Sequence, residues 1–149
     1  DIINNLNLLT LYANVIAFQT ELKMILSAEI ISTSNDVEAD AVGSIFIFEA
    51  DFFRSMHLCD SFWGIFRTMV KGGARKIIID MKNLDFVDSI GISVLINASK
   101  LVKSVKGALV ITNISENVEV MLKPLDISRF FFVMDNNSEA RTFLTGGKF

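Results

Sequence analysis

The residues best suited to chemistry form one short stretch, Asp88-Ser89-Ile90-Gly91, which follows an apolar run and a polar loop. A Ser at the start of a helix can accept hydrogen bonds from the free backbone N–H groups of the first turn. Its hydroxyl would also lie at the positive end of the helix, where an added phosphate is favourable. Gly91 lowers helix propensity by up to about 1 kcal/mol, which indicates a close approach to the backbone there. These residues leave two roles open for Ser89: a plain helix cap or a regulated hydroxyl.

Strand and helix patterns alternate around this stretch. The continuous apolar run at 76–81 predicts a strand covered on both faces, and apolar residues at steps of three and four predict a helix over 89–104. We expect further strands at 28–34, 44–50, 109–114 and 129–134, and further helices at 56–70, 115–122 and 138–144. This order predicts an α/β fold, with about four helices packed on a mixed sheet of about five strands. The sheet should be mixed because the first two strands are joined too briefly for a crossover.

The apolar strand, the loop and the Asp-Ser-x-Gly sequence that opens an amphipathic helix together resemble the STAS domain. This domain is found in bacterial anti-sigma factor antagonists and in the cytoplasmic tails of sulfate-type anion transporters. The order of elements from about residue 27 onward matches it as well. We therefore expect an N-terminal extension over 1–26, with a helical pattern and no assigned role, followed by a STAS domain over 27–149.

The resemblance implies a switch protein that binds a partner and is not an enzyme. In antagonist members, the Ser after the Asp, here Ser89, is phosphorylated by an anti-sigma factor that is itself a kinase. The unphosphorylated form binds this kinase and frees the sigma factor. The resemblance thus implies phosphorylation at Ser89, no cofactor or metal, and a partner-binding surface made of Asp88, Ser89, Ile90, Gly91, Ile92 and Asp51.

The sequence departs from the family pattern at three places. Asp51 stands near the position where antagonists commonly carry an Asp that faces the kinase, but ungapped spacing back from Ser89 places Arg54 closer to it. Ile90 replaces the small Ser or Thr that is common there, and the N-terminal extension is not part of the domain. A second function stays open: a STAS accessory or scaffold subunit, docked on a transporter ATPase or a signalling assembly, without a phosphate cycle.

The composition of the 149-residue chain limits the other classes of function. Its net charge is −3 and its basic residues are scattered, so we expect no nucleic-acid partner. Its mean hydropathy is high at +0.46, but no apolar run approaches the roughly 18 residues of a membrane-spanning helix. The single cysteine fits a reducing compartment. We expect a cytoplasmic protein with a protein partner and no membrane insertion, and homo-oligomerisation stays open.

Two other clusters give weaker signals. One offers a metal at most three ligands, with no second cluster to complete a zinc site: His57, Cys59 and Asp60. The other resembles the acidic cluster of a phospho-acceptor receiver domain, although its spacing is that of a loop: Asp80, Asp85 and Asp88.

Overall fold

Four parallel strands form the centre of the computed structural model, which describes residues 43, 45–50 and 56–149. The strands are β1 (Ile45–Glu49), β2 (Lys76–Asp80), β3 (Ala108–Thr112) and β4 (Phe132–Met134), in the spatial order β1-β2-β3-β4. The last residues of the four strands are in register: Glu49, Asp80, Thr112 and Met134. The carboxyl ends of the strands therefore meet at one edge of the sheet, where the following loops begin.

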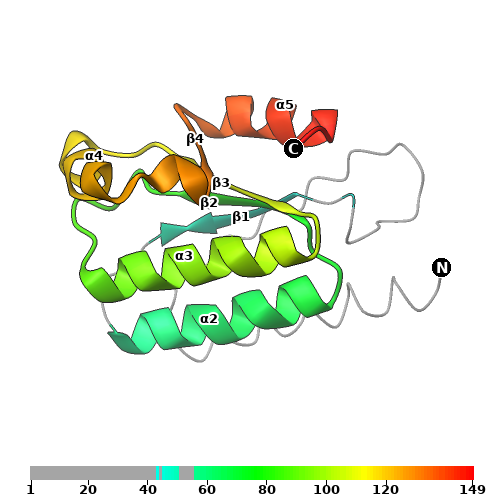
Figure 1. Cartoon of the computed structure of the whole chain (residues 1–149), viewed down its shortest axis with the longest axis horizontal. Helices are drawn as coiled ribbons and strands as arrows, with labels where there is room; N and C mark the ends of the chain where they lie inside the picture. The colour runs from blue at the N-terminus through cyan, green and yellow to red at the C-terminus, as the bar shows by residue number, and fades with distance from the viewer. Residues whose placement is uncertain (1–42, 44, 51–55) are drawn as a thin grey trace.

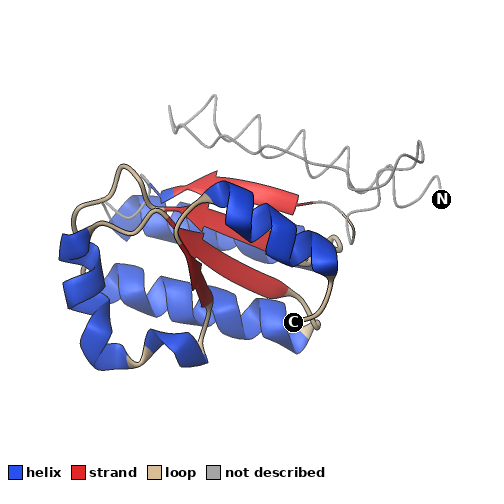
Figure 2. Ribbon diagram, turned by 90° about the horizontal axis from the view of Figure 1, so that it is seen from above, coloured by secondary structure: helices blue, strands red, loops and turns tan. Residues whose placement is uncertain are grey.

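Helices cover both faces of this sheet. Helices α2 (Met56–Lys71) and α3 (Ser89–Ser104) pack side by side on one face, and α5 (Asn137–Gly146) lies on the other (Figure 1). Between β3 and β4 the chain forms α4 (Glu116–Leu122) and two 3-10 turns, η2 (Lys123–Leu125) and η3 (Ile127–Arg129). Figure 2 shows the strands side by side between the helices. Because β1, β2 and β3 are covered on both faces, their central residues are apolar, and polar residues stand only at strand ends.

Two apolar clusters hold the layers together. The larger one fills the space between the sheet and the α2–α3 pair, where the Phe48 and Phe62 rings meet edge to face at 5.4 Å between centroids. The smaller one lies under α5 and joins Ile47 and Ile78 to Leu144. Phe48 and Ile47 serve different clusters because successive side chains of a strand point to opposite faces.

The α/β fold and the four helices of the described residues confirm the prediction from sequence. Ser115 caps α4, since its side chain accepts a hydrogen bond from the Val118 N–H. All four described strands are parallel. The strand expected at 28–34, which would make the sheet mixed, lies outside the described residues, as do the extension at 1–26 and Asp51.

The last strand is shorter than predicted. We expected it over 129–134, but β4 begins at Phe132. The residues before it form a 3-10 turn, and their carbonyls bond to α3: Lys103 Nζ donates to the Arg129 carbonyl at 2.7 Å, and Ser99 Oγ donates to the Phe130 carbonyl. Helix α3 thus takes up acceptors that a longer strand would have used in the sheet.

Candidate protein-binding site

Asp88, and not Ser89, caps helix α3. Asp88 has an extended backbone, with φ −84° and ψ 177°, and its Oδ1 accepts a hydrogen bond from the Gly91 N–H at 2.8 Å. The Asp88 carbonyl accepts from the Ile92 N–H at 3.0 Å, so the helix begins at Ser89. Of the two roles that the sequence leaves open for Ser89, the plain helix cap is therefore wrong. An aspartate competes better for this position because it brings a charged acceptor to the positive end of the helix.

Moving the cap to Asp88 leaves the Ser89 hydroxyl available. Ser89 is exposed, and among the described residues its Oγ has no hydrogen-bond partner. The Ser89 backbone carbonyl accepts a hydrogen bond from Ser93 Oγ at 2.8 Å, but this bond does not involve the Ser89 hydroxyl. A hydroxyl in the first turn of a 16-residue helix faces solvent near free backbone N–H groups. A phosphate on Ser89 would be held favourably there.

Exposed apolar side chains flank this hydroxyl. Ile90 is 40% exposed and Phe86, in the preceding loop, is 62% exposed. Ile92 is half-buried and packs on the larger core cluster, and Gly91 is buried. Of the predicted contact residues, Asp88, Ser89 and Ile90 therefore face solvent together, whereas Gly91 and Ile92 lie behind them.

Carboxylates make the same surface acidic. Asp85 and Asp88 are exposed around Ser89, and Asp60 is exposed on α2, which packs against α3. Burial raises the pKa of the Cys59 thiol, and the Asp88 and Asp60 carboxylates add to that effect. Asp88 is therefore close enough to the start of α2 to act on Cys59 electrostatically.

A buried aspartate fixes the loop that leads to this site. Asp80 is 3% exposed, and its Oδ1 accepts hydrogen bonds from the Lys82 N–H at 3.0 Å and from Asn113 Nδ2 at 2.9 Å. Its Oδ2 accepts from Asn137 Nδ2 at 3.0 Å. Lys82 Nζ lies 3.5 Å from Glu49 Oε1 and 3.9 Å from Asp80 Oδ2. With its lone pairs in use and little solvent access, Asp80 serves the architecture and does not resemble an accessible phospho-acceptor.

Two parts of this arrangement were not predicted from the sequence. Phe86 was not singled out, although a large aromatic side chain in a loop with three charged residues was the available signal. Asp80 was noted only as one of several acids, although a carboxylate at the end of an apolar strand indicates a buried acceptor that needs donors. Both residues shape the surface around Ser89.

The weaker hypothesis from the sequence was a metal held by His57, Cys59 and Asp60. Within the described residues, no group of three His, Cys, Asp or Glu side chains could hold a metal ion. The His57 side chain lies outside what the structure describes. A search of the described helices for one long and apolar enough to cross a membrane also finds none.

Known structures share this fold. The crystal structure of a candidate anti-sigma factor antagonist from Thermotoga maritima superposes with a TM-score of 0.65 at 18% identity, covering 80% of this chain and 94% of its own. The anti-sigma factor antagonist SpoIIAA in its unphosphorylated form gives a TM-score of 0.62 at 15% identity, covering 80% of this chain and 97% of its own. At such low identities, the likeness concerns the fold.

Sequence comparison points the same way. A Thermotoga neapolitana protein, described as a homologue of the same candidate antagonist, is 29% identical over 76 residues, which span 51% of this chain and 67% of the relative. The family model described as the STAS domain matches residues 10–144. The domain boundary near residue 27 stays a prediction. Since the family model covers most of the chain, and the fold agrees with it, this protein belongs to the STAS domain family.

Proposed function

We propose that this chain is an anti-sigma factor antagonist that binds an anti-sigma factor through the start of α3. The α3-start surface consists of Asp85, Phe86, Asp88, Ser89 and Ile90. The observation that carries the proposal is the exposed Ser89 hydroxyl at the start of α3, with two exposed apolar residues, Phe86 and Ile90, within three positions of it in the chain. Apolar residues that face solvent beside a helix terminus are typical of a protein-binding surface. The names of the relatives, which are anti-sigma factor antagonists, support the choice of partner.

In this proposal the partner is a kinase and Ser89 is its substrate. The γ-phosphoryl group of ATP bound to the partner is transferred to Ser89 Oγ; the bond to the β-phosphate breaks, ADP leaves, and the hydroxyl proton passes to a base of the kinase. This chain contributes the accessible hydroxyl and the surface that docks it. Its role is binding, and the chemistry belongs to the partner.

Phosphorylation would then act as an electrostatic switch. It adds about 1.5 to 2 negative charges at pH 7, beside the carboxylates of Asp85 and Asp88. A charge brought into an apolar contact must lose its hydration, and one like-charge contact at about 4 Å costs about 4 kcal/mol at an effective dielectric near 20. Because each 1.4 kcal/mol is about tenfold in affinity, this cost is enough to release the partner. No change of fold is needed.

Affinity capture from native lysate tests the partner. The baits are the wild-type chain, Ser89→Ala, Ser89→Asp and the control Ser104→Asp, which places the same charge at the other end of α3. We expect a kinase-like ATPase with wild type, Ser89→Ala and Ser104→Asp, and its loss with Ser89→Asp. Equal capture of a transporter ATPase or an assembly protein by all four baits would instead favour the accessory or scaffold function.

A further inference from the structure

Strand β4 lies at one end of the described sheet and is only three residues long. Among the described strands it pairs with β3 alone. Phe132 and Val133 are 37% and 47% exposed, so apolar side chains reach solvent from both faces of the strand. The outer edge of such a strand presents backbone N–H and C=O groups that another strand can pair with.

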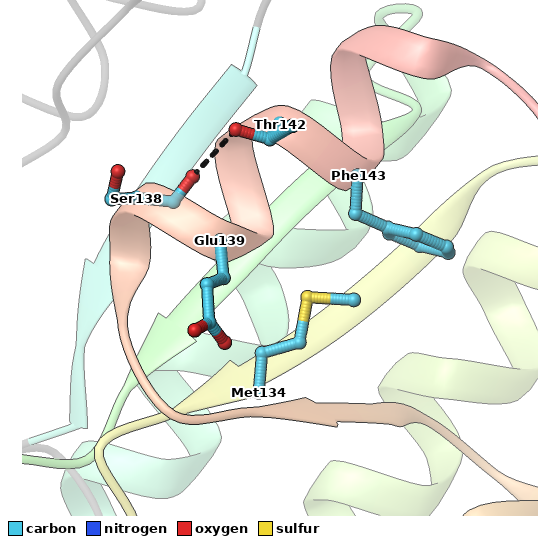
Figure 3. Close-up of a pocket in the computed structure, with 5 residues that line it drawn as sticks. All are labelled: Met134, Ser138, Glu139, Thr142 and Phe143. Carbon is cyan, nitrogen blue, oxygen red and sulfur yellow. Dashed lines mark hydrogen bonds between the residues drawn. The ribbon is translucent and has the colours of Figure 1, made fainter.

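A groove runs along each side of this strand. The groove between β4 and α5 has a volume of about 410 Å³ and is lined by Met134, Ser138, Glu139, Thr142 and Phe143 (Figure 3). The groove on the side of α4 and η3 has a volume of about 350 Å³ and is lined by Ile114, Glu119, Ile127, Val133, Met134 and Asp135. Met134 lines both grooves. The two hollows therefore lie on either side of the end of β4, and we call the strand with its two grooves the β4 edge.

The groove beside α5 is mainly apolar, whereas the groove on the side of α4 and η3 is lined by polar and apolar groups alike. The Phe132 and Phe143 rings lie 4.7 Å apart between centroids, and the Phe143 and Phe149 rings lie 5.9 Å apart. Phe149 is itself 43% exposed. Figure 3 shows the Met134 side chain extending from β4 toward the Phe143 ring. Both residues line the groove, so an occupant would cover Met134 and Phe143.

The rim of the β4 edge is acidic. Glu119, Asp135 and Glu139 are exposed, and none of them forms an ion pair with a described residue. The Glu139 carboxylate only accepts a long bond from the Asp135 N–H, at 3.4 Å. No Lys or Arg is among the residues that line the two grooves. Three carboxylates around these grooves favour a cationic occupant and disfavour nucleic acid.

We infer that the β4 edge binds an extended segment of another protein, with a short apolar centre flanked by lysine or arginine. Such a segment would add a strand beside β4. Its alternate apolar side chains would enter the groove lined by Phe143 and the groove lined by Val133, and its cationic ends would lie near the three carboxylates. A second copy of this chain fits less well, because two β4 edges face to face would oppose Asp135 and Glu139 with their own like charges. The inference does not use Ser89 and is independent of the proposed function.

A peptide titration followed by fluorescence anisotropy tests the inference. The probe is a fluorescein-labelled peptide with two lysines on each side of four alternating valines and isoleucines. A matched peptide carries glutamates in place of the lysines, and a third carries the lysines but has two adjacent backbone amides N-methylated. We expect saturable binding of the lysine peptide, at least about tenfold tighter than that of either control peptide.

Variants of the chain locate the binding. The double variant Glu119→Gln/Asp135→Asn should lower the affinity for the lysine peptide by about fivefold or more. The control Asp60→Asn/Asp85→Asn removes the same amount of charge elsewhere and should change this affinity by less than about twofold. Val133→Lys, an exposed substitution, should abolish binding with little effect on unfolding. Circular dichroism of each variant confirms that the fold is intact.

Three outcomes would overturn the inference. One is the absence of saturable binding of the lysine peptide to the wild-type chain. Another is equal weakening by the two double variants, which would indicate attraction to the overall negative charge. The third is a dimer in sedimentation equilibrium that Val133→Lys abolishes, because it would assign the β4 edge to a second copy.

Discussion

The Asp80 carboxylate and the Asn137 amide are hydrogen-bonded at 3.0 Å although 57 residues separate them in the chain. The bond joins the end of β2 to the first residue of α5, and Thr112 Oγ1 donates to the same Asn137 side chain from the end of β3. The loop that carries the α3-start surface and the helix that borders the β4 edge therefore share one buried anchor.

Replacing Asp80 should destabilise the whole domain. Asp80→Ala leaves three donors without their acceptor: the Lys82 N–H, Asn113 Nδ2 and Asn137 Nδ2. A fully buried donor left unpaired costs about 1 to 3 kcal/mol. These three donors are only partly buried and water reaches some of them, so we expect a total loss of about 2 to 4 kcal/mol. Urea unfolding measures it. A loss below about 0.5 kcal/mol would mean that water satisfies these donors.

Because Asp88 caps α3 and Ser89 does not, substitutions at these two positions should affect the free energy of unfolding differently. Asp88→Ala removes the acceptor of the Gly91 N–H and should lower the free energy of unfolding by about 1 kcal/mol, whereas Asp88→Asn should retain most of it. Ser89→Ala should change it by less than about 0.5 kcal/mol, as for an exposed site. Thermal and urea unfolding compare the three. If Ser89→Ala proves as costly as Asp88→Ala, the assignment of the cap is wrong.

Two glycines predict opposite signs for the same substitution. A Cβ on Gly107 would lie 2.4 Å from the Arg75 carbonyl oxygen and 2.7 Å from Val102 Cγ1, so Gly107→Ala should destabilise by about 1 to 3 kcal/mol. A Cβ on Gly64, within α2, meets nothing within 4 Å. Gly64→Ala should therefore stabilise by up to about 1 kcal/mol through helix propensity. Equal effects in urea unfolding would contradict the tight approach at Gly107.

The Cys59 thiol predicts how stability depends on pH. Burial, then Asp88 and Asp60, raise its pKa above the ordinary value of 9.0. The unfolded chain then releases the thiol proton at a lower pH than the folded chain. The protonated thiol therefore contributes its full stabilisation of the folded state below the unfolded pKa. This stabilisation is lost as the pH rises through the folded pKa. From about pH 7 to pH 10, the free energy of unfolding should fall less for Cys59→Ala than for wild type, and the fall for Asp88→Asn should lie between the two. Parallel losses in all three proteins would refute this.

Much of the fold could be predicted because its signals are local. The apolar run of β2 and the three- and four-residue steps of α3 depend only on neighbouring residues, and α3 was predicted with its observed bounds. The start of β4 was not predictable in this way. Its aromatic residues favour a strand, but Lys103 and Ser99, on another element, bond to the carbonyls before it. Such competition from distant donors is not visible in a local pattern.

The candidate site was predictable in part for the same reason. The Asp-Ser-x-Gly sequence marked the helix start, but only Ser89 was considered as its cap, although an Asp side chain can accept the same bond. Exposure was also undecided, because it depends on packing: Ile90 faces solvent and Ile92, two residues on, packs on the core. The buried role of Asp80 needs two partners from β3 and α5 that no spacing near Asp80 reveals.

Isothermal titration calorimetry with the captured and purified anti-sigma factor measures whether Ser89 controls binding at the α3-start surface. We expect Ser89→Ala and Ser104→Asp to bind within about twofold of wild type. We expect Ser89→Asp, and more so the chain phosphorylated at Ser89, to bind at least about a hundredfold more weakly. Equal affinities for wild type, Ser89→Asp and the phosphorylated chain would contradict control by Ser89.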